Sequence, residues 1–103
     1  MAVIQISQEE FEGKINGTNK KVLIDCYAEW CGPCKMISPI IDELSEEIDT
    51  CEFYKLNIDE GEEIARKYDI MSIPTILIFK DGNLIDKSVG FRTKEELAEI
   101  INK

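Results

Sequence analysis

The stretch K-V-L-I-D-C-Y-A-E-W-C-G-P-C-K, residues 21–35, decides the fold. Residues 21–28 are mostly apolar, include the β-branched Val22 and Ile24, and predict a buried strand, whereas residues 36–48 predict a helix. Cys31 and Cys34 therefore stand where a strand leads into a helix. Two cysteines with two residues between them close reversibly into a small disulfide ring, and the first helical turn lowers the cost of a thiolate there. The stretch predicts a redox site.

The composition predicts one globular domain, residues 1–103. The chain is 44% hydrophobic and 32% charged, which excludes a disordered tail, and at this length it buries roughly two-thirds of its unfolded surface. Four cysteines are too few for a disulfide scaffold, so they need chemical or packing explanations. The net charge is −9, from 12 basic and 21 acidic residues, and the basic residues are scattered. We therefore expect no nucleic-acid partner.

The amino-terminal residues 1–7 contain no basic region, long apolar region or cleavage pattern. The longest unbroken stretch of aliphatic and aromatic side chains runs from Ile76 to Phe79, far short of a membrane span. We expect a cytoplasmic protein with no membrane partner. Because that compartment keeps thiols reduced, paired cysteines there are more often catalytic or metal-binding than structural.

Helix and strand signals alternate along the chain. Three capping boxes, each an oxygen-bearing residue with a glutamate three residues later, predict helix starts at Ser7 with Glu10, Asp59 with Glu62, and Thr93 with Glu96. A fourth helix follows the dithiol, with Pro33 in its first turn. Apolar, β-branched runs predict strands at residues 2–6, 21–28, 51–57, 75–80 and 84–89.

The resulting element order is βαβαβαββα. We expect right-handed parallel crossovers for the strand–helix–strand units. The turn Asp81-Gly82-Asn83 predicts an antiparallel hairpin for the last two strands. The sequence thus predicts an α/β fold, a mixed five-stranded sheet flanked by four helices on both faces.

The dithiol lies where ligand chemistry gathers in open α/β sheets, just past the carboxyl end of strand 21–28. The chain has no histidine, so activation of Cys31 falls to the helix N-terminus, helped by Lys35. In thiol-disulfide exchange, the Cys31 thiolate attacks a substrate disulfide and Cys34 then displaces the substrate sulfur, which passes two electrons to the substrate. We assign attack to Cys31 because we expect it to be exposed at the helix end and Cys34 to be partly covered.

A structural zinc site is the alternative, with Cys26 and Cys51 as the remaining ligands. These two residues form no second C-x-x-C. If Asp25 pairs level with Lys55, Cys51 lies about four residues from that level, roughly 13 Å along the strand, which also forbids a disulfide with Cys26. We interpret both as small apolar side chains in the core and expect neither a metal nor another cofactor.

Asp25 and Pro74 each allow two interpretations. Asp25 interrupts an apolar run, and a buried carboxylate with a raised pKa takes and gives a proton near neutrality, here for Cys34. Its alternative is a hydrogen-bonded or partly solvated aspartate with no catalytic part. Pro74 is either an ordinary strand start or the site of a cis bond, which about one in twenty X-Pro bonds in folded proteins adopts.

The segments V-L-I-D-C-Y-A-E-W-C-G-P-C-K, K-L-N-I-D, S-I-P-T and the D-G turn closely resemble the thioredoxin family, from about Val3 to the carboxyl terminus. The resemblance implies the thioredoxin fold and a general protein disulfide reductase. It implies these roles: nucleophile Cys31, resolving thiol Cys34, proton-transfer carboxylate Asp25, its charged neighbour Lys55, and the cis-proline Pro74. The positions expected to bind substrate are Trp30, Gly32, Pro33, Ile73, Pro74 and Gly90. The implied partners are disulfide-containing target proteins and a thioredoxin reductase, and we expect a monomer.

Three positions depart from the family pattern without touching the exchange chemistry. Cys26 stands where an aromatic residue is common in the family, and Tyr27 stands where tryptophan is frequent. Met71 lies in a loop near the expected substrate groove, at a position where many members carry another residue. These three departures leave open which reductase and which target proteins bind this protein. Two rival functions also remain: a disulfide-forming oxidase or isomerase, which Gly32-Pro33 and the missing export signal oppose, and a binding module in which the dithiol is incidental.

Overall fold

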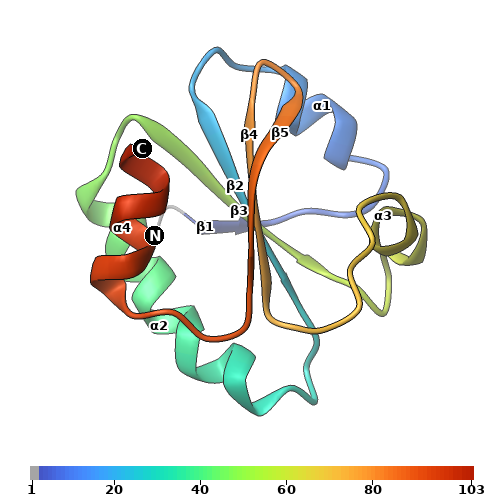
Figure 1. Cartoon of the computed structure of the whole chain (residues 1–103). Helices are drawn as coiled ribbons and strands as arrows, with labels where there is room; N and C mark the ends of the chain where they lie inside the picture. Colours follow the sequence, from blue (N-terminus) through green and yellow to red (C-terminus); the bar gives the residue numbers. More distant parts are fainter. Residues whose placement is uncertain (1–2) are drawn as a thin grey trace.

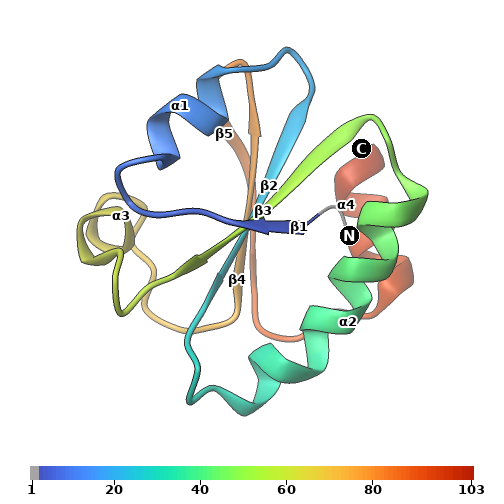
Figure 2. The same cartoon turned by 180° about the vertical axis from the view of Figure 1, so that it is seen from behind.

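A computed structural model describes residues 3–103, so Ala2 of the predicted first strand lies outside the described residues. Within this range the elements follow in the predicted order βαβαβαββα. They are β1 (Val3–Gln5), α1 (Phe11–Asn16), β2 (Lys21–Tyr27), α2 (Gly32–Glu47), β3 (Cys51–Asn57), α3 (Glu62–Lys67), β4 (Thr75–Lys80), β5 (Asn83–Val89) and α4 (Lys94–Asn102). Helices α1 and α3 cover one face of the sheet, and α2 and α4 cover the other (Figures 1 and 2). The predicted mixed five-stranded sheet with four helices is confirmed.

The central strand of the sheet is β2, which leads into the dithiol. The strand order is β1-β3-β2-β4-β5, and β1, β3 and β2 are parallel. Asp25 pairs level with Lys55, which is the register assumed above in separating Cys26 from Cys51. Residues 22–26 are buried because β2 has a neighbouring strand at each edge and helices over each face.

Strand β4 runs against the predicted direction. It pairs antiparallel with β2, so the connection from β3 through α3 to β4 is not a parallel crossover. The loop after α3, residues 69–74, spans about 20 Å when extended, which is enough chain to reverse direction before β4. The chain turns at Asp69, whose φ is 54°, and returns to the carboxyl edge of β2, where Thr75 pairs with Cys26. The start of β4 therefore lies at the same edge of the sheet as the dithiol.

Two apolar cores hold the helices on the sheet. Successive side chains of β2 point to opposite faces, so Leu23 joins the core under α2 and α4, and Ile24 joins the core under α1 and α3. The second core contains an aromatic group of Phe11, Tyr68 and Phe79. The ring centroids of Phe11 and Phe79 are 5.6 Å apart, and those of Tyr68 and Phe79 are 5.4 Å apart, both in edge-to-face geometry.

Two of the predicted capping boxes form, but only one begins a helix directly. At the start of α4, the Glu96 N–H donates to Thr93 Oγ1 (3.2 Å) and the Thr93 N–H donates to Glu96 Oε1 (2.9 Å). Ser7 and Glu10 exchange the same pair of bonds, at 2.8 and 3.2 Å. These bonds hold a turn, and α1 begins only at Phe11.

The prediction that Asp59 caps α3 is wrong. The helix begins after Gly61, whose position carries no side-chain cap. Gln8, in the loop after β1, supplies the cap, because its Oε1 accepts from the N–H groups of Glu63 (2.8 Å) and Ile64 (3.3 Å). Because the capping residue is so distant in sequence, the local spacing of residues around the helix start does not predict it.

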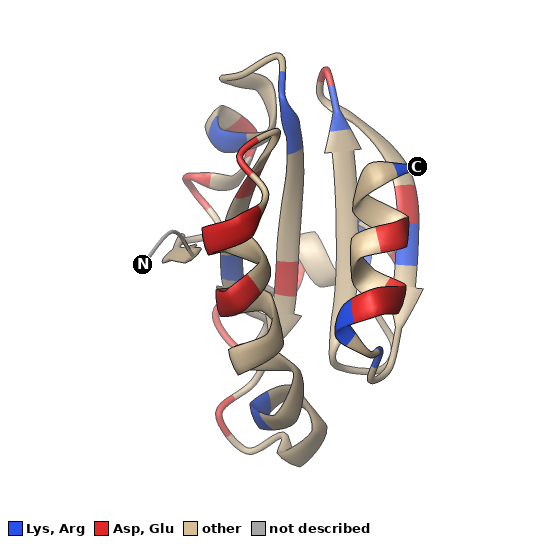
Figure 3. Ribbon diagram, turned by 90° about the vertical axis from the view of Figure 1, so that its left-hand side faces the viewer, with Lys and Arg blue, Asp and Glu red and all other residues tan. Residues whose placement is uncertain are grey.

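The last two strands form the predicted antiparallel hairpin. Asp81 and Gly82 have φ values of 54° and 81°, the positive values that a tight hairpin turn requires. Strand β5 begins at Asn83, one residue before its predicted start. In Figure 3 the Asp and Glu residues of α2 and α4 make this side of the molecule acidic. Across residues 3–103, no helix has both the length and the apolar character to cross a membrane.

Candidate active site

The dithiol occupies the turn from β2 into α2. Cys31 and Cys34 form a disulfide, and their Cα atoms are 5.3 Å apart. The turn closes where the Cys31 N–H donates to the Ala28 carbonyl (3.2 Å). Cys31 is the N-cap of α2, since its Sγ accepts from the Cys34 N–H (3.2 Å). The helix begins at Gly32, and Pro33 suits the first turn because it has no N–H to leave unpaired.

The two cysteines do not differ in exposure as predicted. In the disulfide form Cys31 is 4% exposed and Cys34 is 3% exposed, so the expected exposed approach to Cys31 is absent. Both pack in a small apolar cluster with Ala28, to which Tyr27 and Ile73 add partly buried surface. What distinguishes the sulfurs is their surroundings: Sγ of Cys31 meets the helix N-terminus, and Cys34 lines a cavity.

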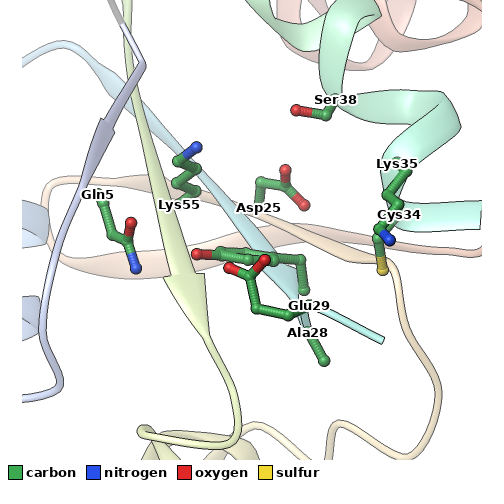
Figure 4. A pocket seen from close by; sticks show the side chains of 9 residues that line it. Gln5, Asp25, Ala28, Glu29, Cys34, Lys35, Ser38 and Lys55 are labelled. Carbon is green, nitrogen blue, oxygen red and sulfur yellow. The ribbon is translucent and has the colours of Figure 1, made fainter. Parts of the chain in front are cut away.

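This cavity, of ≈ 180 Å³, connects Cys34 with Asp25. In Figure 4 the Asp25 carboxylate lies between the Lys55 amine and the Cys34 sulfur. The remaining lining comes from residues on β1, β2 and α2 and from the turn that follows β2: Gln5, Tyr27, Ala28, Glu29, Lys35 and Ser38. The cavity therefore joins the buried acid to the second cysteine.

Asp25 is 3% exposed, and its Oδ1 is buried without a hydrogen-bond partner among residues 3–103. Burial raises the pKa of this carboxyl to about 7, opposed by the positive charge of Lys55 and reinforced by the negative charge of Asp42. Of the two alternatives, a hydrogen bond from the protein to Oδ1 is absent among residues 3–103, and proton transfer by Asp25 stays a prediction.

The loop before β4 faces the dithiol. The Ile73–Pro74 bond is cis, so of the two interpretations of Pro74 the cis bond is the one observed. The Pro74 carbonyl accepts from the Gly90 N–H (2.8 Å), which ties the loop to the end of β5. Gly90 has a φ of 89°, in the region that favours glycine. Ile73 packs against the cluster that contains Cys31 and Cys34.

Comparison with known proteins agrees with this geometry. The family model described as Thioredoxin matches residues 2–103. The thioredoxin of Staphylococcus epidermidis is 46% identical over 104 residues, covering 100% of this chain and 98% of that protein. The chain belongs to the thioredoxin family. The thioredoxin of Staphylococcus aureus is 43% identical with the same coverage. A mutant thioredoxin from Halobacterium salinarum has a TM-score of 0.90 and 30% identity, covering 97% of this chain and 88% of that chain.

Family membership and the disulfide together define the chemistry. The chain has the thioredoxin fold, and it is a thiol-disulfide oxidoreductase with a redox-active Cys31–Cys34 pair. The W-C-G-P-C-K sequence, residues 30–35, forms the turn and first helical residues in which the disulfide lies.

A second hollow lies beside the Cys31–Cys34 disulfide, on the side of the cis-proline loop. Its volume is ≈ 280 Å³, and its lining is mostly apolar: Trp30, Ile58, Ile70, Met71, Ser72 and Ile73. Trp30 is 69% exposed and Met71 is 86% exposed. The Trp30 indole N–H donates to Asp59 Oδ2 (2.9 Å), which orients the ring. Exposed apolar side chains beside a redox pair are suited to contact a protein substrate.

The other two cysteines do not line the cavity that joins Asp25 and Cys34. Cys26 and Cys51 are free and buried, and the strand register places Cys26 opposite Leu56 and Cys51 opposite Lys21. The predicted separation of the two is therefore confirmed. Within residues 3–103, no group of three or more His, Cys, Asp and Glu side chains is placed to hold a metal ion.

Sequence reasoning missed three polar residues of the cavity, Gln5, Glu29 and Ser38. Ser38 had a detectable signal, since it lies one helical turn after Cys34 on the same face of α2. Gln5 had a weaker one, because it pairs with Lys55 only if β1 lies beside β3. The partnership of Asp59 with Trp30 had none, because it joins two loops.

Proposed function

We propose that the protein is a general reductase of protein disulfides, acting through dithiol–disulfide exchange. The observation that carries the proposal is the disulfide at the N-terminus of α2, with a buried carboxylate on the Cys34 side of it. In the reduced protein the Cys31 thiolate attacks one sulfur of a substrate disulfide, and the other substrate sulfur leaves as a thiolate. The product is a mixed disulfide.

Resolution assigns different tasks to Cys34 and Asp25. The Cys34 thiol gives its proton to the Asp25 carboxylate, and the resulting thiolate attacks Cys31 Sγ. The bond between Cys31 and the substrate breaks, the Cys31–Cys34 disulfide forms, and the substrate leaves with two electrons more than it brought. The raised pKa of Asp25, about 7, supports this role because the carboxyl takes and releases a proton near neutral pH. Lys55 limits the rise in that pKa, so the carboxylate remains available as a base.

We propose that the substrate lies in the groove between the dithiol turn and the cis-proline loop. Trp30, Gly32 and Pro33 form one side of it, and Ile73, Pro74 and Gly90 form the other. The Pro74 carbonyl already pairs with Gly90, so the backbone of Ile73 is the part of this loop that we propose pairs with an extended substrate segment. Main-chain pairing of this kind accepts many substrate sequences.

The proposal implies an electron source and a compartment. After each turnover the disulfide must be reduced, and we propose a thioredoxin reductase as the partner that does so. We propose that the protein acts as a monomeric, single-domain electron carrier in cell redox homeostasis. The cytoplasm suits this role because its low reduction potential keeps a dithiol reduced.

Turnover of a model protein disulfide with dithiothreitol as donor tests the proposal. We expect Cys31→Ser and Cys34→Ser to lose turnover, and Cys34→Ser to trap a covalent mixed disulfide through Cys31. Cys51→Ala, which alters a buried cysteine outside the site, is the matched control and should turn over normally. Full activity in either active-site variant would falsify the mechanism, and a cellular role that survives Cys31→Ser would favour the binding module.

A further inference from the structure

Ser38 is a polar residue of the Cys34–Asp25 cavity that the proposed mechanism does not use. It lies one turn after Cys34 in α2 and is half-buried. Its hydroxyl points into the cavity on the side where Asp25 and Lys55 lie (Figure 4). Because this direction faces the buried acid, the hydroxyl is placed to act on the group that takes the Cys34 proton.

The hydroxyl of Ser38 differs from the other serine of the same helix. A serine inside a helix commonly donates to a carbonyl of the preceding turn. Ser45 does so, since its Oγ donates to the Asp42 carbonyl (2.7 Å). Among the described residues, 3–103, no such bond engages the Ser38 hydroxyl. The helix backbone therefore leaves this hydroxyl available to the cavity.

The cavity suits a bound water. A water needs polar partners and room, and ≈ 180 Å³ lined by Gln5, Asp25, Ser38 and Lys55 supplies both. Asp25 Oδ1 is buried with no protein partner within residues 3–103, and such an atom is a strong acceptor for a water in that space.

We propose that Ser38 is a positioning residue for proton transfer: its hydroxyl holds a water in this cavity, and that water hydrogen-bonds to Asp25 Oδ1 on the path from Cys34. The inference rests on the proposed role of Asp25 and adds the group that serves it. The water accepts the Cys34 thiol proton as it donates one of its own protons to the Asp25 carboxylate. The Cys34 thiolate then attacks Cys31 Sγ, and the substrate sulfur leaves.

The charges around Asp25 set the background against which Ser38 acts. Lys55 approaches from β3 and Asp42 from α2, whereas Glu29 and Lys35 stand at the cavity wall. A hydrogen bond donated to the carboxylate favours its charged form. Removing the Ser38 hydroxyl while these charges stay in place is therefore expected to raise the pKa of Asp25.

The test compares Ser38→Ala, Ser38→Thr and Ser45→Ala by carboxyl-carbon NMR titration of Asp25 in the oxidised protein. We expect Ser38→Ala to raise the pKa of Asp25 by about one unit, the size of one hydrogen bond to a charged group. Ser38→Thr keeps the hydroxyl and should restore the wild-type value, and Ser45→Ala should not change it. An unchanged pKa in Ser38→Ala, an equal shift in Ser45→Ala, or no recovery in Ser38→Thr would each overturn the proposal.

Turnover against pH separates this inference from the mechanism on which it rests. With a shift of one unit, turnover of Ser38→Ala falls by up to about tenfold near pH 6 and is nearly unchanged near pH 9. Asp25→Asn is measured alongside. If Asp25→Asn retains the wild-type pH profile, the proposed role of Asp25 fails. If Asp25→Asn loses turnover and Ser38→Ala follows the wild type at every pH, only the role of Ser38 fails.

Discussion

Replacing Asp25 with asparagine should make the oxidised protein more stable at alkaline pH and leave it unchanged in acid. The carboxyl is buried, and its Oδ1 has no partner among residues 3–103. Its negative charge is therefore poorly solvated in the folded state, whereas the unfolded chain solvates it well. Asparagine has nearly the same shape and carries no charge at any pH. The variant thus removes the cost of ionisation and little else.

The magnitude follows from the pKa. Burial, opposed by Lys55, raises the pKa of Asp25 from 3.8 to about 7. Below pH 3.8 the carboxyl is protonated in both the folded and the unfolded state, so its full contribution to stability is present. As the pH rises from about 4 to 7 the unfolded state releases the proton first, and stability is lost; above 7 the loss is complete. At 1.36 kcal/mol per pKa unit, the total is about 4 kcal/mol.

Urea unfolding of both oxidised proteins from pH 4 to pH 9 measures this quantity, with Trp30 fluorescence as the signal. We expect nearly equal free energies of unfolding at pH 4 and a gap of about 4 kcal/mol in favour of Asp25→Asn at pH 8. Other titrating groups affect both proteins alike and cancel in the difference. Asp49→Asn, at an exposed aspartate, is the control and should follow the wild type. A gap that does not change with pH would refute the reasoning.

Three smaller predictions test other contacts. Thr93→Ala removes the hydroxyl that caps α4 and should lower the free energy of unfolding by about 1 kcal/mol in urea titrations, with Thr93→Ser as the control that keeps the cap. Asp59→Ala should free the indole of Trp30, and because Trp30 is the chain's one tryptophan, the fluorescence anisotropy should fall. Asp59→Asn keeps a hydrogen-bond acceptor and is the control. Equal anisotropy in wild type and Asp59→Ala would show that the hydrogen bond does not hold the ring. Burial raises the pKa of the Cys26 thiol, and it raises the pKa of the Cys51 thiol to about 12. After alkylation of the reduced protein, mass spectrometry should therefore find both cysteines unmodified in the native state and both modified after unfolding. Alkylation of either cysteine in the native state would contradict their burial.

The sequence predicts the strands of this fold well where burial decides them. Strands β3 and β4 have their predicted bounds, because each is an apolar run between turn residues, and no neighbour is needed to locate its ends. The direction of β4, by contrast, does not follow from the local sequence pattern. It depends on how residues 69–74 cross the end of the sheet, which is set by packing across the molecule. The cap of α3 was not predicted for the same reason, because Gln8, which supplies it, is brought to the helix only by packing across the molecule.

The candidate site divides in the same way. The C-x-x-C spacing between a predicted strand and a predicted helix located Cys31 and Cys34, and the assumed register of two parallel strands, which the structure has, places Asp25 level with Lys55. The cavity was not predictable, because β1, β2, β3 and α2 each contribute part of its wall. The exposure of Cys31 was predicted wrongly because its position at a helix end said nothing of the apolar cluster that covers it.

Cys31 and Cys34 are almost equally buried as residues, so burial does not assign their roles. If access decided which one attacks, values of 4% and 3% would leave the choice open. Their partners differ instead, because a spacing of three places Cys31 at the N-cap and Cys34 inside the first turn. An N–H aimed at Cys31 Sγ stabilises a thiolate there, as an attacking sulfur requires. Cys34 faces the cavity with Asp25, where its proton has an acceptor when the mixed disulfide is to be resolved. One helix start thus supplies both conditions, and we infer the order of attack from it.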